Sequence, residues 1–450
     1  MSIEEIFSNQ KNLIKICKKY LNNVKKDKID IITSPLCFFT TWADTPGNLK
    51  VNDFCGVKNK KKIIFIIKNL LTGCKYFDLK LFHKKNCIKK YDNLIVSYSQ
   101  KNDFDSDGNF LDRYFNYDDK DINSFWILIS LDNYVPSNFK SNISIIAKKK
   151  KFSFSFGYLF KELFKIIGRS NFNFKMLAHN CWSEYIFAQK IFSISKSILK
   201  NIEFKNIIMN YEGIPFQNNL INEVKKISKK IRAFGYLHCA PWPLQTELIY
   251  KKKLFNKFIV SGEDQKKVLN TYYGWKNSDI KVVPSLRFNK TKKKEFTGSI
   301  FLPFNLIYFK EYLNRFEMLL QNSPNNFFNN LYVRIHPLNI DSKVHKKFSI
   351  LIHELLLKYK DKFSNKKKKI CIFFGSATGV SIQALEEGNE IIHFPLNEIL
   401  DVYSPYIWEN LSVKKIEKSI YKYKILKKDM IFKTTYEKKK FQKYIIPIIK

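Results

Sequence analysis

Two short apolar runs, each ending abruptly in polar or glycine residues, most constrain the fold of this chain. Tyr332–Ile335 leads into His336 and Pro337, and Ile370–Phe374 leads into the loop Gly375-Ser376-Ala377-Thr378-Gly379. Runs of this length and composition predict buried strands of a parallel sheet. Ligands of open α/β sheets bind just beyond the carboxyl ends of the strands, so both strand ends are candidate site positions.

Strand-like runs alternate with amphipathic helical stretches through most of the chain. In the first part, such runs lie at residues 29–33, 63–67, 93–97, 125–130, 143–147, 206–210, 233–239 and 257–261. In the second part, runs at 299–303, 331–335, 370–374 and 390–394 alternate with helical periodicity at 309–321, 343–360 and 380–388. This alternation predicts parallel βαβ units. The expected fold is α/β, with two Rossmann-like lobes, parallel sheets and a cleft between the lobes.

The domain organisation follows from length and local composition. A chain of 450 residues is too long for one ordinary core. We expect a first lobe over residues 1–288, with a helical extension at its start, and a second lobe over residues 296–425. Residues 289–295 are charged and lack apolar periodicity, which indicates a linker. The lysine-rich segment 426–450 is expected to be a basic, helical tail.

Composition narrows the class of protein. Hydrophobic residues make up 45% of the chain, which argues against global disorder. There is no uncharged apolar run of 18 residues and no apolar core near the start, so we expect neither a transmembrane helix nor a secretory signal. The expected location is the cytoplasm. The eight cysteines include no Cys-x-x-Cys pair, which argues against a zinc ribbon or a disulfide framework.

The formal net charge of +39 comes almost wholly from lysine, with 73 lysines against six arginines. Lysine runs occur throughout, at residues 60–62, 148–151, 251–253, 292–294, 366–369 and 438–440. A nucleic-acid-binding protein would concentrate charge on one element and use arginine forks. We therefore expect a solvated basic surface and no nucleic-acid partner. The same positive charge would also attract the protein to anionic lipid of the inner membrane, which would favour peripheral association.

Glu212 is the candidate catalytic residue of the first part of the chain. It follows the strand-like run 206–210 and precedes Gly213, so it lies where sheet folds place catalytic groups. A carboxylate facing the cleft could deprotonate an acceptor hydroxyl. The competing interpretation is an acid that favourably faces the dipole of the next helix.

The second part supplies candidate phosphate contacts. His336 can donate hydrogen bonds to a phosphate oxygen, and Pro337 ends the strand at the point where the imidazole is presented. In the following loop, Ser376 and Thr378 offer hydroxyls, while Gly375 and Gly379 allow close backbone approach. Such donors stabilise the negative charge that develops on a departing nucleotide. Ordinary turn and N-cap chemistry is the alternative for the loop.

Together these motifs resemble those of bacterial sialyltransferases and related capsule glycosyltransferases of the GT-B fold. The resemblance spans residues 90–410 and implies that Glu212 is the general base, that His336 contacts the donor phosphate, and that Ser376 and Thr378 also grip it. Two positions depart from the pattern: Tyr211 stands where a second acid is frequent, and Ala377 separates the two hydroxyls. The segments 109–115, 211–216 and 236–243 also resemble a broader bacterial family of surface carbohydrate biosynthesis proteins.

Other polar positions have weaker signals. The Asp-rich segment 103–109 begins like a calcium loop but has Tyr114 at the twelfth position, so we interpret it as a polar loop bordering the acceptor cleft. Asn397 or Glu398, after the run 390–394, could contact a base or a ribose. The candidate cleft and acceptor residues are Tyr211, Gly213, His238, Trp242, Asp107 and Asn109, and Arg334 is added to the donor side.

The sequence therefore predicts a nucleotide-sugar-dependent glycosyltransferase that needs no metal or cofactor. Its donor would be an acid sugar, such as sialic acid or Kdo, carried on CMP. Its acceptor would be a cell-surface or lipid-linked glycan. The alternatives are a polyol-phosphate transferase of teichoic-acid type, a noncatalytic polysaccharide-assembly protein and, last, a basic nucleic-acid-binding protein.

Overall fold

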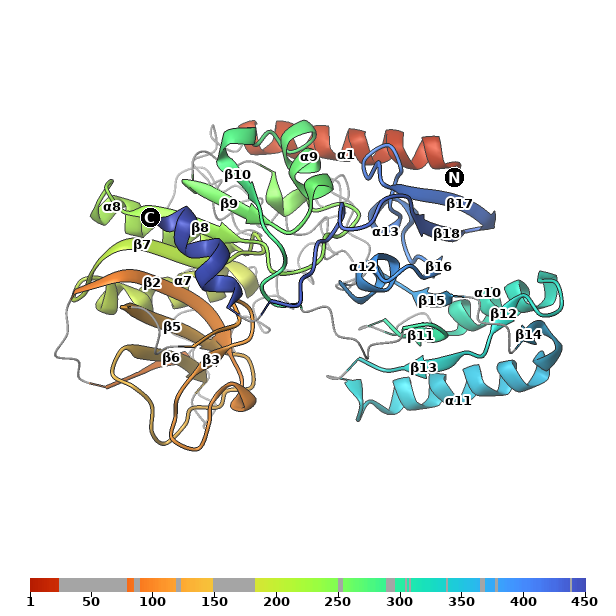
Figure 1. Cartoon of the computed structure of the whole chain (residues 1–450), viewed down its shortest axis with the longest axis horizontal. Helices are drawn as coiled ribbons and strands as arrows, with labels where there is room; N and C mark the ends of the chain where they lie inside the picture. Colours follow the sequence, from red (N-terminus) through yellow and green to blue (C-terminus); the bar gives the residue numbers. More distant parts are fainter. Residues whose placement is uncertain are drawn as a thin grey trace, which may run out of the picture.

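The computed structural model describes most of the chain and places it in two α/β lobes (Figure 1). Outside the described residues lie 24–78, 85–89, 119–122, 149–182, 250–253, 289–295, 304–305, 307–308, 337–338, 365–368, 377–378 and 438. The expected strands at 29–33 and 63–67, the expected linker, and Pro337, Ala377 and Thr378 fall in these gaps.

The first lobe is built on an eight-stranded sheet with the order β1-β6-β5-β2-β7-β8-β9-β10. All neighbours pair in parallel except β1, which runs antiparallel to β6. The strands are β1 (Leu79–His83), β2 (Lys90–Ser99), β5 (Ser124–Ser130), β6 (Ile143–Lys148), β7 (Glu203–Asn210), β8 (Arg232–Tyr236), β9 (Lys257–Val260) and β10 (Ile280–Val282). A short hairpin of β3 (Leu111–Asp112) and β4 (Tyr117–Asp118) follows β2.

The second lobe is built on a six-stranded sheet with the order β13-β11-β15-β16-β18-β17. Its first four strands are parallel, and a closing antiparallel hairpin covers one edge. The strands are β11 (Ser299–Phe301), β13 (Tyr332–Arg334), β15 (Ile370–Phe374), β16 (Glu390–Phe394), β17 (Leu411–Glu417) and β18 (Ile420–Ile425). A separate parallel pair joins β12 (Phe328–Asn329) to β14 (Phe363–Ser364).

Helices connect the parallel strands in both lobes. Those of the first lobe are α7 (Ser183–Leu199), α8 (Pro215–Ile227) and α9 (Glu263–Thr271). Those of the second are α10 (Phe309–Asn322), α11 (Lys343–Lys358), α12 (Gly379–Glu386) and α13 (Glu398–Asp401). This arrangement confirms the predicted α/β fold class, because each lobe has its own parallel-rich sheet with crossover helices.

The α1 helix (Ile3–Asn23) runs along the top of the molecule and spans both lobes (Figure 1). The amide of Gln10 donates to the carbonyl oxygens of Ile399 and Val402, each at 2.8 Å. Ile6 and Ile14 are buried in a hydrophobic core that contains residues of both sheets. Burial of this apolar face gives the lobes a continuous interface.

The C-terminal segment returns from the second lobe to the first. Two residues that follow β18, Met430 and Lys433, bond to the first lobe. The Met430 carbonyl oxygen accepts from Asp264 N at 3.0 Å, and Lys433 N donates to Ser261 O at 2.6 Å. A π-helical turn (Phe441–Ile445) and α14 (Ile446–Ile449) then pack against the core of the first sheet. The helical expectation for 426–450 therefore applies only to its last part, and the rest of the segment connects the lobes.

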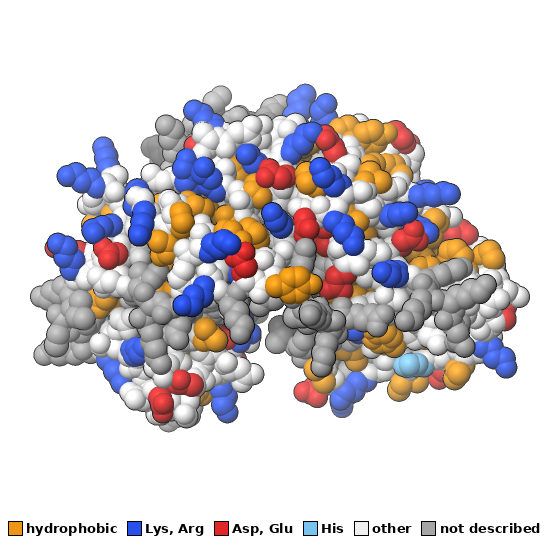
Figure 2. Space-filling view, in the orientation of Figure 1, with side chains coloured by type: hydrophobic (Ala, Val, Ile, Leu, Met, Phe, Trp, Pro, Cys, Tyr) orange, Lys and Arg blue, Asp and Glu red, His pale blue; other side chains and the backbone are white. Residues whose placement is uncertain are grey.

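Basic side chains are spread over the face shown in Figure 2 and lie on both lobes. Of the helices among the described residues, none is both long and apolar enough to cross a membrane. Among the described residues, Cys17, Cys239 and Cys371 are free thiols, and Cys17 and Cys371 are buried.

Candidate functional site

The loop that carries Glu212 is fixed by the side chain of Gln217 in the first turn of α8. The Gln217 amide donates to Asn210 O at 2.7 Å, and its oxygen accepts from Glu212 N at 2.9 Å and from Ile214 N at 3.1 Å. Gly213 has φ +80°, and a Cβ there would lie 2.8 Å from Glu247 Cγ. A residue other than glycine would therefore meet both backbone strain and a collision.

Glu212 pairs with His238, which follows the neighbouring strand β8. His238 Nε2 lies 2.9 Å from Glu212 Oε1, and the two side chains are 2% and 30% exposed, respectively. The other ring nitrogen, His238 Nδ1, is buried and has no hydrogen-bond partner among the described residues. Because both imidazole nitrogens are covered, the carboxylate is the member of the pair that a substrate can reach.

The pKa of Glu212 lies below its ordinary value although burial alone would raise it. The charge of His238 and its hydrogen bond lower the pKa, and the Arg287 guanidinium lowers it further. Glu212 is therefore ionised at neutral pH, which a general base requires.

The Tyr114 ring packs against the His238 ring, with the ring centroids 4.6 Å apart and the rings nearly perpendicular. The buried Asp112 holds this tyrosine in place, because its Oδ2 accepts from Tyr114 N at 3.0 Å. Ser97 Oγ donates to the other Asp112 oxygen at 2.5 Å, and burial raises the pKa of Asp112 to about 7. The hairpin after β2 thus supports the imidazole that orients Glu212.

In the second lobe, His336 follows β13 and is partly buried. Burial, followed by the positive potential of His345, lowers the pKa of His336. His345 Nε2 in turn contacts Pro303 O at 2.9 Å, and a Cβ on Gly375 would lie 2.7 Å from Pro303 Cβ. The ends of β13, β11 and β15 therefore adjoin one another, although β11 separates the two strands that carry the predicted motifs.

His393 on β16 fixes the start of the predicted phosphate loop. Its Nε2 donates to Gly375 O at 2.6 Å, while its Nδ1 contacts Tyr423 Oη at 3.0 Å. Gly375 has φ +82°, a conformation that favours glycine. The neutral imidazole suits this site, since burial lowers the pKa of His393 to about 4.

The two lobes meet beside Glu212. A Cβ on Gly379, at the start of α12, would lie 3.5 Å from Ala240 Cβ, two residues after His238. Tyr403 Oη donates to Pro241 O at 2.7 Å, and Trp408 Nε1 donates to Pro243 O at 3.0 Å. The segment after β8 therefore forms part of the lobe interface, and it brings the Glu212 pair close to the second-lobe loop.

Three other candidate site residues lie in the first-lobe core, in the second-lobe sheet and in the lobe interface. Tyr211 is buried in the first-lobe core and donates to Asn218 Oδ1 at 2.5 Å. Arg334 donates to Tyr332 Oη of the same strand at 2.5 Å and lies over the ring of Phe296, which precedes β11. Trp242 is partly buried in the interface segment.

The Asp-rich loop after β2 is closed on itself. Asp105 Oδ1 accepts from Asp107 N at 3.0 Å and from Asn109 N at 2.8 Å, and Asn109 Nδ2 donates to Asp105 Oδ2 at 2.7 Å. This geometry agrees with a polar loop. In the described part of the chain, no three His, Cys, Asp or Glu residues are grouped as metal ligands would be.

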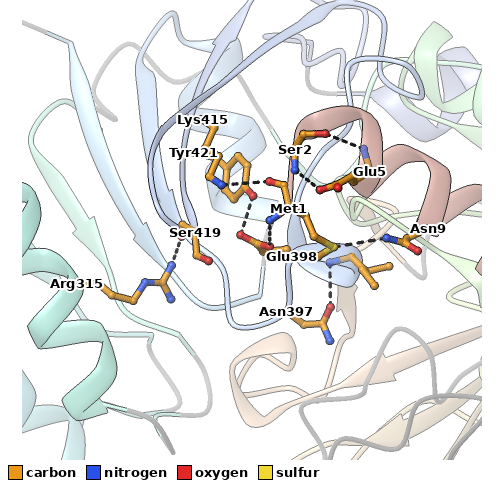
Figure 3. Close-up of polar contacts among 11 residues, drawn as sticks. Met1, Ser2, Glu5, Asn9, Arg315, Asn397, Glu398, Lys415, Ser419 and Tyr421 are labelled. Carbon is orange, nitrogen blue, oxygen red and sulfur yellow. Dashed lines mark hydrogen bonds and ion pairs between the residues drawn. The ribbon is translucent and has the colours of Figure 1, made fainter.

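Asn397 and Glu398 make the polar contacts shown in Figure 3. Asn397 Oδ1 caps α13 by accepting from Ile399 N at 2.9 Å. Glu398 accepts from Tyr421 Oη at 2.8 Å and pairs with the Met1 amino group at 3.2 Å.

Sequence reasoning missed three residues of this region: Tyr114, Arg287 and Lys440. Tyr114 lies within a segment that resembles surface carbohydrate proteins, which was a usable signal. Arg287 stands outside any motif, and Lys440 is one of three lysines in the run 438–440, so local sequence patterns could not select either residue.

No protein-family model matches the chain, and neither does any curated protein. Among solved structures, the wall teichoic acid polymerase TagF is similar at a TM-score of 0.28 and 10% identity, covering 77% of this chain and 78% of that one. A TagF variant soaked with CDPG has a TM-score of 0.26 and 10% identity, covering 76% and 79%. The overlap is shallow, so the fold class rests on the strand order of the two sheets.

Proposed function

We propose that this protein is a transferase that joins a nucleotide-activated group to a hydroxyl of a cell-surface glycan acceptor. The observation that carries the proposal is the partly exposed Glu212 carboxylate, fixed by His238 at the sheet edge beside the second-lobe loop. In this proposal Glu212 accepts the proton of the attacking hydroxyl while the nucleotide departs.

The second lobe would hold the donor. His336 follows β13 and Ser376 follows β15, at strand ends where phosphate would be expected. Thr378, which lies outside the described residues, would add a second hydroxyl in this proposal. The backbone N–H groups at the start of α12 would favour negative charge there. Transfer would proceed without a metal, with these donors stabilising the phosphate charge.

Two donor classes fit this chemistry. A CMP-linked acid sugar would be attacked at its anomeric carbon, whereas a nucleotide-linked polyol phosphate would be attacked at phosphorus. Product analysis separates them, since the first gives a glycoside and the second a phosphodiester. The name of TagF, the solved structure with shallow similarity, agrees with the second class.

The acceptor would be a glycan, free or lipid-linked, and the protein would act on the cytoplasmic face of the inner membrane. The lysine-rich surface would then be attracted to anionic lipid. Binding to vesicles that contain anionic lipid, but not to neutral vesicles, is the expected result.

Nucleotide-dependent thermal stabilisation tests the proposal directly. CMP, CDP, UDP, GDP and ADP are each added to the purified protein, with and without EDTA. A ligand at about 100 times its dissociation constant stabilises the folded state by about 2.7 kcal/mol, which gives a measurable midpoint shift. An EDTA-insensitive shift with CMP or CDP supports the proposal. No shift with any of the five would contradict it and favour the noncatalytic assembly protein.

His336 allows a matched test of the donor site. His336→Ala should weaken nucleotide binding and leave the fold intact, because the side chain is partly exposed at a strand end. His353→Ala removes an exposed histidine of α11 and serves as the control. Equal nucleotide affinities in the two variants would refute the phosphate contact.

A further inference from the structure

Arg287 is a cation near the candidate base, and its guanidinium forms no ion pair with a described residue. Its guanidinium Cζ lies 4.9 Å from the centroid of the Tyr114 ring and 5.0 Å from that of the Phe288 ring. No hydrogen bond or ion pair joins the guanidinium to a residue in the described part of the chain. The side chain is partly exposed, so a solute can reach it.

The two rings determine the orientation of this guanidinium. An arginine stacked on aromatic faces keeps its planar fork free for a bidentate contact. Tyr114 also packs against His238, so Arg287 and Glu212 are supported by the same aromatic ring and imidazole. The Arg287 charge lowers the pKa of Glu212, which shows that the two groups are within electrostatic reach.

The backbone on both sides of Arg287 is anchored from a distant part of the chain. The buried Lys440 ammonium donates to Ser285 O at 2.7 Å and to Phe288 O at 2.6 Å. Leu286 N donates to Tyr236 Oη at 2.8 Å, at the end of β8. The loop is therefore held in one conformation before any substrate arrives, which lowers the entropic cost of binding.

We propose that Arg287 is the anion-binding residue of the acceptor site and recognises a phosphate or carboxylate group on the acceptor. The guanidinium has no hydrogen bond or ion pair among the described residues, it lies over two aromatic rings, and it is on the Glu212 side of the lobe interface. This inference rests on the proposed transferase function and adds the acceptor class, an anionic glycan.

The favoured ligand follows from the geometry of the fork. A planar guanidinium binds two oxygens of one phosphate or carboxylate group through parallel N–H···O bonds. Arg287 belongs to the first lobe and lies beside the base, so its anion would be on the molecule that loses a proton to Glu212. The donor phosphate would instead contact the strand ends of the second lobe.

Inorganic phosphate and acetate are the probes for a direct test. Each is titrated against chloride at constant ionic strength, while the thermal midpoint and the NMR signal of the Arg287 side-chain N–H are recorded. We expect one or both anions to shift the wild-type signal and raise the midpoint. Arg287→Gln should weaken the affinity about tenfold or more, as loss of charge-assisted hydrogen bonds predicts.

Lys281→Gln is the matched control, because it removes one positive charge from an exposed position on β10 of the same segment. It should retain wild-type anion affinity. Equal stabilisation of wild type and Arg287→Gln by both anions, or a wild-type signal that neither anion shifts, would overturn the proposal.

Nucleotide titrations distinguish an acceptor-binding role of Arg287 from a donor-binding role. If Arg287 serves the acceptor, CMP and CDP affinities stay within about twofold in Arg287→Gln, and phosphate still shifts the Arg287 signal when nucleotide is saturating. Loss of nucleotide affinity in the variant, or competition between phosphate and nucleotide, would overturn the acceptor assignment. The anion titration remains readable if no nucleotide binds, so failure of the transferase proposal is distinguishable from failure of this one.

Discussion

Replacing His393 by phenylalanine should lower stability at neutral pH and make it less dependent on pH. The imidazole lies under the predicted phosphate loop and contacts Gly375 O and Tyr423 Oη. His393→Phe keeps a ring of similar size but removes both polar contacts. A buried carbonyl without its donor costs about 1–3 kcal/mol, which is the expected loss at pH 7.

The pH dependence follows from the direction of the pKa shift. Burial lowers the pKa of His393 from 6.5 to about 4, so the unfolded chain binds a proton between these values and the folded protein does not. The wild type therefore loses stability as the pH falls through this window, by about 3 kcal/mol in total and by about 2 kcal/mol between pH 7 and pH 5. His393→Phe lacks this contribution.

The stability difference between wild type and His393→Phe should thus narrow by about 2 kcal/mol from pH 7 to pH 5. Urea unfolding at both pH values measures it, with His353→Phe, at an exposed position of α11, as the control. NMR titration of the imidazole signals provides a direct check. An His393 signal that titrates near pH 6.5, or a stability difference that is the same at both pH values, would refute the reasoning.

Three further substitutions test the site and its supports. Glu212→Gln should reduce transfer about 10²–10⁴-fold with nucleotide binding retained, whereas Glu203→Gln, at the exposed start of the same strand, should be active; equal rates would remove Glu212 from catalysis. Gly262→Ala would place a Cβ 2.0 Å from a backbone carbonyl oxygen of the returning C-terminal segment, so unfolding free energy should fall by about 1–3 kcal/mol, and an unchanged thermal midpoint would argue against that contact. Lys440→Met leaves two carbonyl oxygens without their donor and should lower stability by about 2 kcal/mol, while the exposed Lys439→Met should be neutral; identical midpoints would contradict the anchoring role.

Local periodicity predicted much of the architecture. The ranges of β15 (Ile370–Phe374) and β16 (Glu390–Phe394) coincide with the expected strands, and α10 (Phe309–Asn322) differs from its expected range by one residue. Runs of β-branched and aromatic residues that end in glycine or polar residues identify buried parallel strands without reference to distant parts of the chain.

The end of β8 shows where the local pattern fails. The apolar run 233–239 predicts a longer strand, yet β8 ends at Tyr236 and the following residues enter the lobe interface. Residues buried by another lobe are as apolar as residues buried within a strand. The sequence pattern alone does not distinguish these two kinds of burial.

By itself the sequence determined the two sets of βαβ units and the strand ends at which Glu212 and His336 lie. Only the tertiary structure paired Glu212 with His238, placed Tyr114 against that imidazole and brought Lys440 to the Arg287 loop. Periodicity records which face of a strand or helix is buried, and it is readable from neighbouring residues. Partnerships between distant side chains depend on the strand order and on lobe packing, which emerge only when the whole chain is folded.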